Sequence, residues 1–281
     1  MVKNLDPETV ASFGDEWSRF DQSAMKAEEA HKVFLEYFAV FPWLSLPPDA
    51  QGFDMGCGSG RWARWVAPRV GRLNCIDPSA AIEVARANLA EAHNVEFHRG
   101  SVDEPGLMPE SQDFGYSLGV LHHVPDTAAA IRACVSLLKP GAPLLLYLYY
   151  AFDDRPVWFR ALWSVSDGFR GIVRRFPAGL KHGVTDAIAA CVYFPLARLS
   201  GILEKLGLSI HDIPLSYYRN HSFYTMRTDS RDRFGTPLEK RFKRVEVENM
   251  MRDAGLVDIR FSEGAPYWCA VGTKMKKLCA D

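Results

Sequence analysis

The 281-residue sequence lacks several features that mark other classes of protein. Neither charge is in excess, since 33 Lys and Arg face 34 Asp and Glu, so we expect no strong attraction to nucleic acid or to an anionic membrane. No stretch approaches the roughly 18 apolar residues of a membrane-spanning helix. The best candidate, residues 143–150, is short and is typical of a buried strand. The composition therefore predicts a globular protein with no nucleic-acid and no membrane partner.

Disulfide and metal-ligand patterns are also missing. The six cysteines are scattered, with no CxxC pair and no His/Cys cluster at metal-ligand spacing. Most lie in apolar runs, as Cys75 does, where a buried free thiol is expected. Asp126, Asp153 and Asp154 could contact a hard divalent cation, but they form no dedicated motif, so we expect no metal. The first residues do not resemble a signal peptide, and the predicted location is the reducing cytoplasm.

Short apolar runs alternate with helical patterns through most of the chain. The predicted strands are Gly52–Met55, Leu73–Ile76, Val95–His98, Phe114–Leu121, Leu144–Tyr149, Val257–Phe261 and Tyr267–Thr273. The predicted helices between them are Arg61–Ala67, Ala80–Ala92, Ala128–Leu138 and Val245–Ala254. This alternation predicts βαβ units with right-handed crossovers. The expected fold is α/β, a Rossmann-like, doubly wound, mostly parallel sheet of seven strands.

The alternation stops after the fifth strand and resumes near the C-terminus. We therefore predict four segments: a helical lid at 1–48, a cofactor-binding core at 49–150, a cap at 151–243 and the completion of the sheet at 244–281. In the lid, a helical pattern runs from Met25 to Phe41, and Trp17 or Tyr37 could cover the cofactor, whereas Phe34 and Phe38 are expected in the core. The cap contains helical patterns at 158–173 and 184–206, with enough apolar surface to pack on the core or to form a homodimer.

Glycines alternate in the turn after the first predicted strand. The spacing of Gly56, Gly58 and Gly60 is GxGxG and differs from the GxGxxG of a dinucleotide-binding turn, so no pyrophosphate is implied. Glycine lets a ligand approach the backbone closely. Asp54 precedes the turn and suits a ligand that carries an ammonium group, because charge-assisted hydrogen bonds are strong. A nicotinamide oxidoreductase is disfavoured for both reasons.

Two further carboxylates follow the next two predicted strands. Asp77 ends the second strand, where a carboxylate can accept the hydroxyls of a ribose. Asp103 follows the third strand and could accept a hydrogen bond from an exocyclic amine, with Val102 packed on a purine ring. An ammonium group, a ribose and an adenine without phosphate together describe S-adenosylmethionine.

Five motifs in order carry a resemblance to the class I S-adenosylmethionine-dependent methyltransferases, in particular to small-molecule and sugar O-methyltransferases. They are "DMGCGSG", the acidic Asp77, "GSVD", "DFGYSLGVLHHVPD" and "LLKPGA". The resemblance covers residues 50–150 and, more weakly, 245–275. It implies that the cofactor is held by Asp54, Gly56, Cys57, Gly58, Gly60, Asp77, Pro78, Val102, Asp103 and Leu118.

Two adjacent histidines after the fourth strand are candidates for the chemistry. Methyl transfer needs alignment of the reacting atoms, and a hydroxyl acceptor benefits from a general base, for which histidine is suited near neutral pH. In O-methyltransferases that share the "LHHVPD" pattern, a histidine of the pair acts as the base, which points to His123 before His122. Asp153 could orient a histidine or bind the acceptor hydroxyl. Each residue could also serve only in packing or capping.

The cap is expected to bind a small-molecule acceptor. Residues 214–229 are rich in Tyr, Arg and His without a helical or strand period, which is typical of a binding loop. The predicted acceptor-binding residues are Tyr149, Arg219, His221, Tyr224 and Arg227, suited to a hydroxylated or anionic metabolite. Methylation of carbon or nitrogen, and a non-catalytic subunit that binds the same cofactor, remain the alternatives.

Overall fold

The computed structural model describes residues 3–153 and 155–276, so Asp154 and Cys279 lie outside the described residues. The chain divides into two compact units. The sheet unit comprises residues 3–21, 30–151 and 238–276, and the helical unit comprises residues 22–29, 152–153 and 155–237. Residues 238–243, which we predicted in the cap, therefore belong to the sheet unit.

The sheet unit is built on seven strands in the order β3-β2-β1-β4-β5-β7-β6. Their bounds are β1 Gln51–Met55, β2 Arg72–Ile76, β3 Val95–His98, β4 Phe114–Leu118, β5 Pro143–Tyr147, β6 Leu256–Phe261 and β7 Cys269–Lys274. Strands β1 to β5 pair in parallel, and β7 pairs antiparallel with both β5 and β6. The mostly parallel, doubly wound α/β sheet expected from the sequence is confirmed.

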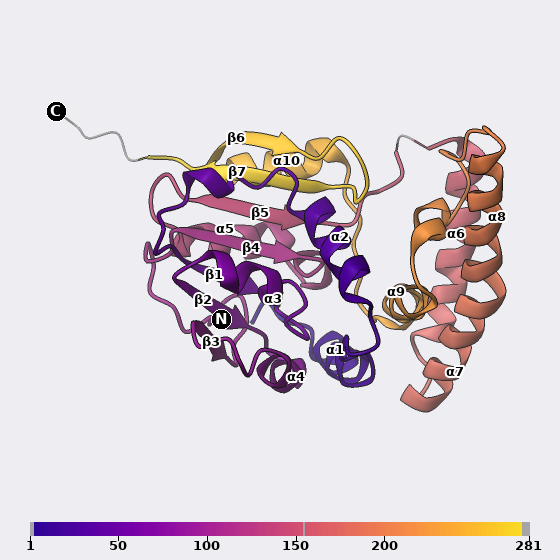
Figure 1. Cartoon of the computed structure of the whole chain (residues 1–281), viewed down its shortest axis with the longest axis horizontal. Helices are drawn as coiled ribbons and strands as arrows, with labels where there is room; N and C mark the ends of the chain where they lie inside the picture. Colours follow the sequence, from indigo (N-terminus) through magenta and orange to yellow (C-terminus); the bar gives the residue numbers. More distant parts are fainter. Residues whose placement is uncertain (1–2, 154, 277–281) are drawn as a thin grey trace. The chain divides into compact units, whose positions relative to one another are not determined.

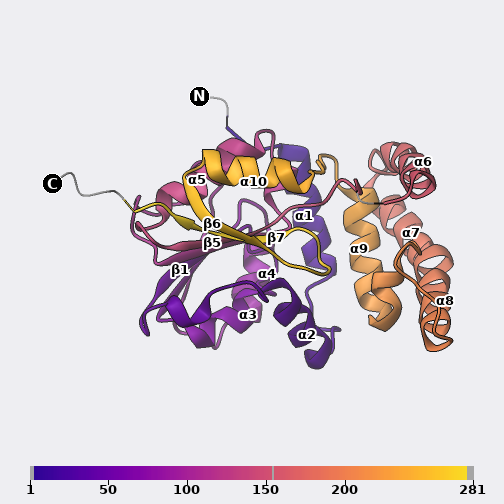
Figure 2. The same ribbon diagram turned by 90° about the horizontal axis from the view of Figure 1, so that it is seen from above.

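Helices cover both faces of this sheet (Figure 2). They are α1 Pro7–Arg19, α2 Ala27–Tyr37, α3 Ala63–Val66, α4 Ala81–Asn88, α5 Thr127–Leu137 and α10 Arg244–Asp253. One apolar core joins the sheet to α2, α3 and α4, and a second core joins the opposite face to α5 and α10. Phe34 and Phe38 are buried in the first core, as expected. Helix α2 begins in the helical unit and continues into the sheet unit.

Helix α1 was missing from the sequence prediction. Its start has two local signals: Asp6 accepts a hydrogen bond from the Thr9 amide at 2.8 Å, and Pro7 is at the first helical position. Its buried residues include Thr9, Ser12, Gly14 and Glu16, which are polar or small. An apolar helical period is therefore absent, and that period is what sequence analysis detects.

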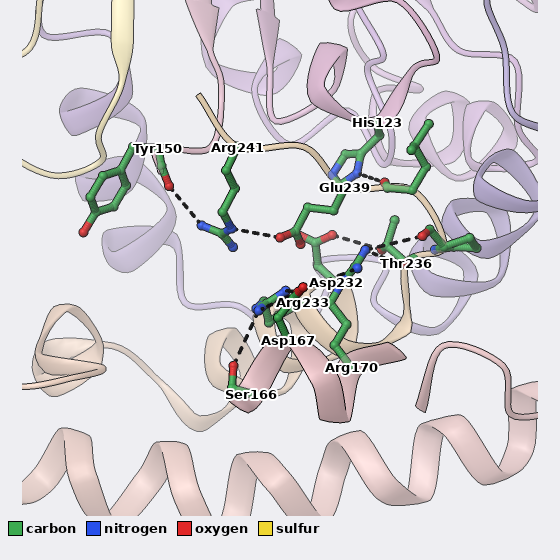
Figure 3. A network of polar contacts seen from close by, with 12 residues as sticks. His123, Tyr150, Ser166, Asp167, Arg170, Asp232, Arg233, Thr236, Glu239 and Arg241 are labelled. Atoms are coloured by element: carbon green, nitrogen blue, oxygen red, sulfur yellow. Dashed lines mark hydrogen bonds and ion pairs between the residues drawn. The ribbon is translucent and has the colours of Figure 1, made fainter. Parts of the chain in front are cut away.

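The helical unit is arranged around α9, Phe223–Gly235. Its other elements are α6 Val157–Val173, α7 Ala178–Ile188, a π-helical turn Ala189–Tyr193, α8 Phe194–Lys205 and a 3-10 helix Ser216–Asn220. Helix α9 contacts α6, α7 and the π-helical turn, and the buried residues Val173, Tyr193, Ala197, Met226 and Phe234 form the core. Ion pairs add to it, since Arg233 donates to Asp167 at 3.2 Å (Figure 3).

Helix α9 corrects the prediction that residues 214–229 form an aperiodic loop. Ser222 caps the helix by accepting from the Thr225 amide at 3.3 Å. The buried face of α9 mixes Met226 and Phe234 with Thr228, Ser230 and Arg231. Because polar residues occupy half of that face, the sequence shows no apolar stripe.

Candidate functional site

The carboxyl ends of β1 and β4 mark the position where the strand order reverses (Figure 1). In open α/β sheets, ligands bind at this switch point. Asp54, the residue before the end of β1, is in register with Cys75 on β2 and with Tyr116 on β4. The site is therefore assembled from the loops that follow neighbouring strands.

The glycine loop after β1 uses its own amides internally. The amides of Gly56 and Cys57 donate to the Ile76 carbonyl at 2.7 and 3.0 Å, and the Gly60 amide donates to Cys57 at 2.8 Å. The Gly58 amide donates to Asp77 Oδ2 at 2.9 Å. A phosphate-binding loop directs its amides toward the ligand. These four amides donate to acceptors within the chain instead.

Two of these glycines are required by the geometry. Gly56 has a φ of +80°, and a Cβ there would lie 2.5 Å from the Val120 side chain. Gly58 has a φ of +54°, and a Cβ there would lie 3.1 Å from the Trp17 indole nitrogen. Since positive φ is readily adopted only by glycine, both positions leave bare backbone facing their neighbours.

Asp54 is a fully buried carboxylate. Burial raises its pKa from 3.8 to about 8, the nearby Tyr116 hydroxyl opposes that shift by hydrogen bonding, and the charge of Asp77 adds to it. Among residues 3–153 and 155–276, neither carboxylate oxygen has a hydrogen bond of normal geometry. A buried charged group in this condition is costly unless a ligand compensates it. An ammonium group would do so, and Asp54 therefore fits the amino end of S-adenosylmethionine.

Asp77, directly after β2, connects the glycine loop to the segment after β2 through its carboxylate. Its Oδ2 accepts from Gly58, and its Oδ1 accepts from the amide and hydroxyl of Ser79 at 2.9 and 2.6 Å. Each carboxylate oxygen has more than one lone pair, so the side chain can still accept a ribose hydroxyl. Pro78 follows directly, half-buried, between these two contacts.

The two residues predicted to contact adenine, Val102 and Asp103, have different surroundings. Val102 is buried and packs in the core on the α5 side of the sheet. Asp103 accepts a hydrogen bond from the Asn4 amide, and the Asn4 side chain exchanges two further hydrogen bonds of 2.7 Å with the backbone of Asp126. The N-terminal segment thus lies across the position expected for the adenine contact of Asp103.

Two other predicted cofactor residues are buried beside the loop. Cys57 contacts Cys75, and this thiol contact together with burial raises the pKa of the Cys57 thiol. Both are free thiols. Leu118 ends β4 and belongs to the core that packs against α2 and α3. Cys57 and Leu118 therefore pack in the apolar core beside the loop, and neither presents a polar group to a ligand.

Helix α1 covers the glycine loop. Trp17 is half-buried with its indole nitrogen next to Gly58, and Gly14 lies against Ser79 and Ala80 at the start of the segment after β2. Tyr37, the other candidate for a cover, instead packs on Trp62 and Tyr147 with ring centroids 4.5 and 4.9 Å away. Of the two aromatic residues singled out from the sequence, Trp17 is the one placed over the loop.

His122 and His123 lie in a 3-10 helix, Leu121–His123, just beyond β4, which ends at Leu118 and not at Leu121 as predicted. The centroids of the two rings are 4.0 Å apart, and His122 packs on Tyr149 with the centroids 3.9 Å apart and the ring planes tilted by 32°. The structure thus brings together three residues predicted from separate motifs. Phe13 of α1 completes the group with an edge contact to His123 at 4.9 Å.

The two histidines have different surroundings. His122 is completely buried, and burial, followed by the charges of His123 and Arg241, lowers its pKa well below 6.5. The Nδ1 of His123 lies 2.6 Å from the Leu238 carbonyl. A carbonyl can only accept, so Nδ1 carries a proton, and in the neutral tautomer that this contact selects Nε2 is the acceptor. The two rings therefore differ: His123 is hydrogen-bonded through Nδ1, whereas burial keeps His122 neutral.

Residues 238–242 form a strap that sequence analysis missed. Lys240 donates its amide to the His122 carbonyl at 3.0 Å, and Phe242 donates to the Tyr149 carbonyl at 2.8 Å. The strap also reaches α1, since the Leu238 amide donates to Thr9 at 3.2 Å. It therefore ties the histidine turn, the end of β5 and the covering helix to one another.

The strap carries an ion pair beside the histidines (Figure 3). Arg241 donates to Glu239 at 2.9 Å, and its guanidinium lies 5.0 Å from the centre of the Tyr149 ring. The side chains are 15% and 2% exposed, so the pair is largely removed from water. In the sequence, these residues are part of a charged run, 239–244, and nothing there separates them from a solvated surface.

The other predicted acceptor-binding residues are engaged in the helical unit. Arg219 makes a two-bond ion pair with Glu204 at 2.7 and 2.9 Å, and Arg227 makes one with Asp186 at 2.9 Å for both bonds. His221 is buried with Nδ1 3.0 Å from the Tyr217 carbonyl, and the Tyr224 hydroxyl accepts from the Gln22 amide at 2.9 Å. These contacts stabilise the unit, and the structure does not gather the four residues into a ligand site.

Of the other candidate carboxylates, Asp126 and Asp153 are among the described residues. Asp126 caps α5 by accepting from the Ala129 amide at 2.9 Å. Asp153 belongs to the helical unit and lies in an exposed turn. Within the described part of the chain, no group of three or more His, Cys, Asp or Glu residues could hold a metal ion.

Comparisons with known proteins agree with this geometry. The family described as "Methyltransferase domain" matches residues 53–146. The chain is 31% identical over 225 residues to the ubiquinone biosynthesis O-methyltransferase of Xanthomonas euvesicatoria, a match that covers 78% of this chain and 87% of that protein. It is 33% identical over the same length and coverage to the protein of that name from Xanthomonas campestris.

Among solved structures, the fold matches a chain of the complex between the Haloferax volcanii Trm112 methyltransferase activator and a methyltransferase. The TM-score is 0.55 with 14% identity, and the match covers 96% of this chain and 99% of that chain. At this identity, the likeness supports the fold alone.

Proposed function

The chain belongs to the S-adenosylmethionine-dependent O-methyltransferases, and from this premise we propose that it methylates a hydroxyl group on a small aromatic acceptor, with His123 as the general base. The observation that carries the proposal is the contact between His123 Nδ1 and the Leu238 carbonyl at 2.6 Å. That contact fixes the tautomer and leaves Nε2 to accept the hydroxyl proton.

The donor end is supported by the buried residues at the β1 and β2 ends. Asp54 would bind the amino group of the cofactor, Asp77 would bind the ribose, and the bare backbone at Gly58 would lie against the ligand under Trp17. When bound, S-adenosylmethionine supplies a methyl group on a positively charged sulfur, which is already strongly activated. The protein's task is therefore to align the acceptor, exclude water and remove one proton.

The aromatic acceptor follows from the rings around the base. Phe13 and Tyr149 lie 4.9 and 5.7 Å from the His123 ring, and Tyr147 lies 5.7 Å from Tyr149. Aromatic faces and edges favour a flat, aromatic ligand by offset and edge contacts, worth roughly 0.5–1.5 kcal/mol each beyond burial. The curated relatives named above act in ubiquinone biosynthesis, which fits a hydroxylated ring as the acceptor.

The ion pair on the strap supports the base from the side. Arg241 is held by Glu239 next to Tyr149, so its charge stays fixed close to the histidine turn. A fixed cation favours the anionic form of a phenol as its proton leaves. This assigns Arg241 a role in stabilising the acceptor oxygen and gives Glu239 the role of positioning Arg241.

We test the proposal by screening hydroxylated aromatic acceptors in an assay for S-adenosylhomocysteine release. His123→Ala should lower kcat by about 100-fold, within the usual range for removing a general base, and leave S-adenosylhomocysteine affinity unchanged in calorimetry. His122→Phe is the matched control, because it keeps a buried ring and should leave kcat nearly intact. An unchanged kcat in His123→Ala would eliminate His123 as the base.

The location and setting are also proposed. A reducing cytoplasm is supported by the described cysteines, which are all free, including the neighbouring Cys57 and Cys75. A small-molecule acceptor, in place of a nucleic acid, fits the near-zero net charge of the whole chain.

A further inference from the structure

Helix α6 exposes an apolar stripe along its length. Trp158, Leu162, Val165, Phe169 and Ile172 recur at intervals of four, three, four and three residues, so they share one side of the helix. Each of these side chains is between 46% and 73% exposed. A helix of a globular protein ordinarily buries such a stripe.

The continuous helix formed by α7, the π-helical turn and α8 has a second stripe. Val192, Leu199, Ile202 and Leu206 are 43% to 70% exposed and share one side of its C-terminal half. By length and composition, residues 178–205 could cross a membrane. The polar contacts of this helix with the rest of the helical unit argue against a membrane-spanning position. Asp186 is paired with Arg227, and the Arg198 guanidinium donates to the backbone at Arg219 and His221.

The apolar exposure is concentrated in the helical unit. Of the nineteen large apolar side chains that are exposed in residues 3–153 and 155–276, fourteen lie between 157 and 223. Large exposed apolar areas on a folded protein mark interaction surfaces. We therefore look for a binding partner of this unit. Among the residues described, the sheet unit has no comparable concentration of exposed apolar side chains.

Charge identifies the occupant. Residues 152–237 contain twelve Lys and Arg but only eight Asp and Glu, a net charge of +4 on a chain whose total is −1. The acids are used locally: Asp167, Asp186, Glu204 and Asp212 each form an ion pair with an arginine of the same unit. Three exposed bases, Arg160, Arg175 and Lys205, flank the apolar stripes.

We propose that the apolar stripes of α6 and α7–α8, which we call the docking face, lie on the surface of an anionic lipid bilayer. Amphipathic helices with Trp, Phe and Leu on one side and Arg or Lys beside them bind in the plane of a membrane interface. A second copy of the chain would bring two positively charged units together, whereas an anionic surface complements them. The sequence expectation of no membrane partner rested on the total charge, which hides the positive charge of this unit.

The test measures co-sedimentation of the full chain with vesicles of phosphatidylcholine alone and with about one third phosphatidylglycerol added. Binding is expected only to the anionic vesicles and should weaken at high salt, where charges are screened. Arg160→Gln with Arg175→Gln should lower the partition coefficient about 25-fold, since each base near the surface contributes about fivefold. Leu162→Gln with Val165→Gln and Ile172→Gln should lower it by at least about 30-fold.

The matched control is Leu44→Gln, which changes a fully exposed leucine of the sheet unit and should leave vesicle binding unaltered. Circular dichroism and S-adenosylhomocysteine calorimetry establish that each variant is folded, so the readout does not depend on catalysis or on the identity of the acceptor. Failure to bind anionic vesicles, or binding that the docking-face variants do not change, would overturn the proposal. A dimer in light scattering that the α6 variant dissociates, without vesicle binding, would instead assign the face to a second copy.

Discussion

The variant Asp54→Asn tests two effects of the buried carboxylate. In the ligand-free protein the carboxylate lowers the free energy of unfolding, and in the complex it is proposed to bind the methyl donor. The carboxyl has a pKa of 3.8 when unperturbed and about 8 in the folded protein, where burial dominates. The folded state therefore holds more protons than the unfolded chain between these two values. It follows that the free energy of unfolding contributed by this group falls as pH rises through that window.

The size of the effect follows from the shift. Each pKa unit corresponds to about 1.4 kcal/mol, so the full window corresponds to about 6 kcal/mol as an upper limit. Asparagine cannot ionise and should escape this loss. Between pH 5 and pH 8 the stability of Asp54→Asn should therefore gain about 4 kcal/mol on that of the natural protein.

Urea unfolding at the two pH values measures this gain, and calorimetry with S-adenosylhomocysteine measures the opposite change in binding. The affinity of the natural protein should rise with pH toward about 8, because the ammonium group binds the deprotonated Asp54. The affinity of Asp54→Asn should be about 100-fold weaker and independent of pH in this range. Asp49→Asn, an exposed carboxylate just before β1, is the control and should change neither quantity.

Two results would refute the reasoning. If Asp54→Asn is less stable than the natural protein at pH 8, the carboxylate is compensated within the folded chain and not by a ligand. If donor affinity is unchanged, the ammonium group binds elsewhere. A gain in stability together with a loss of affinity is the signature of a residue retained for binding at a cost to folding.

Further predictions concern Trp17 of helix α1, which covers the glycine loop, and the strap. Trp17→Ala should weaken S-adenosylhomocysteine binding about tenfold in calorimetry, because the indole lies against Gly58, and equal affinities would place the ligand away from α1. Arg241→Met should destabilise the protein by about 3 kcal/mol in urea unfolding, because it removes an ion-pair partner of the Glu239 carboxylate, whose side chain is only 2% exposed. Adding Glu239→Gln should recover most of that loss, and a purely additive double variant would show that the pair is not coupled.

The position of the proposed donor residues at the edge of the sheet could be predicted from the sequence, because these residues are local in the chain and lie at or just after strand ends. Asp54, the glycine turn and Asp77 lie next to recognisable apolar runs, and parallel strands must end at the same edge of the sheet. The same rule explains why the histidines after β4 lie close to Tyr149 after β5. Asp103 has a contact that the sequence did not predict, since its partner, Asn4, is far away in the chain.

The acceptor residues were harder to predict because their signal was composition and not position. Arg219 and Arg227 are in an Arg- and Tyr-rich stretch, but each has a carboxylate partner elsewhere in the helical unit. The pairing of charges depends on which helices pack together, and no local pattern encodes it. Arginine density alone therefore suggested ligand binding where the structure has ion pairs.

The sequence by itself determined the sheet, the methyl donor and the kind of reaction, because periodicity and strand-end motifs are properties of neighbouring residues. Only the tertiary structure decided the state of the two histidines. The Leu238 carbonyl that orients His123 and the burial that keeps His122 neutral come from segments more than a hundred residues apart. Hydrogen bonding and desolvation act through space, so the side chain that can take the proton is set by the fold and not by the order of residues in the chain.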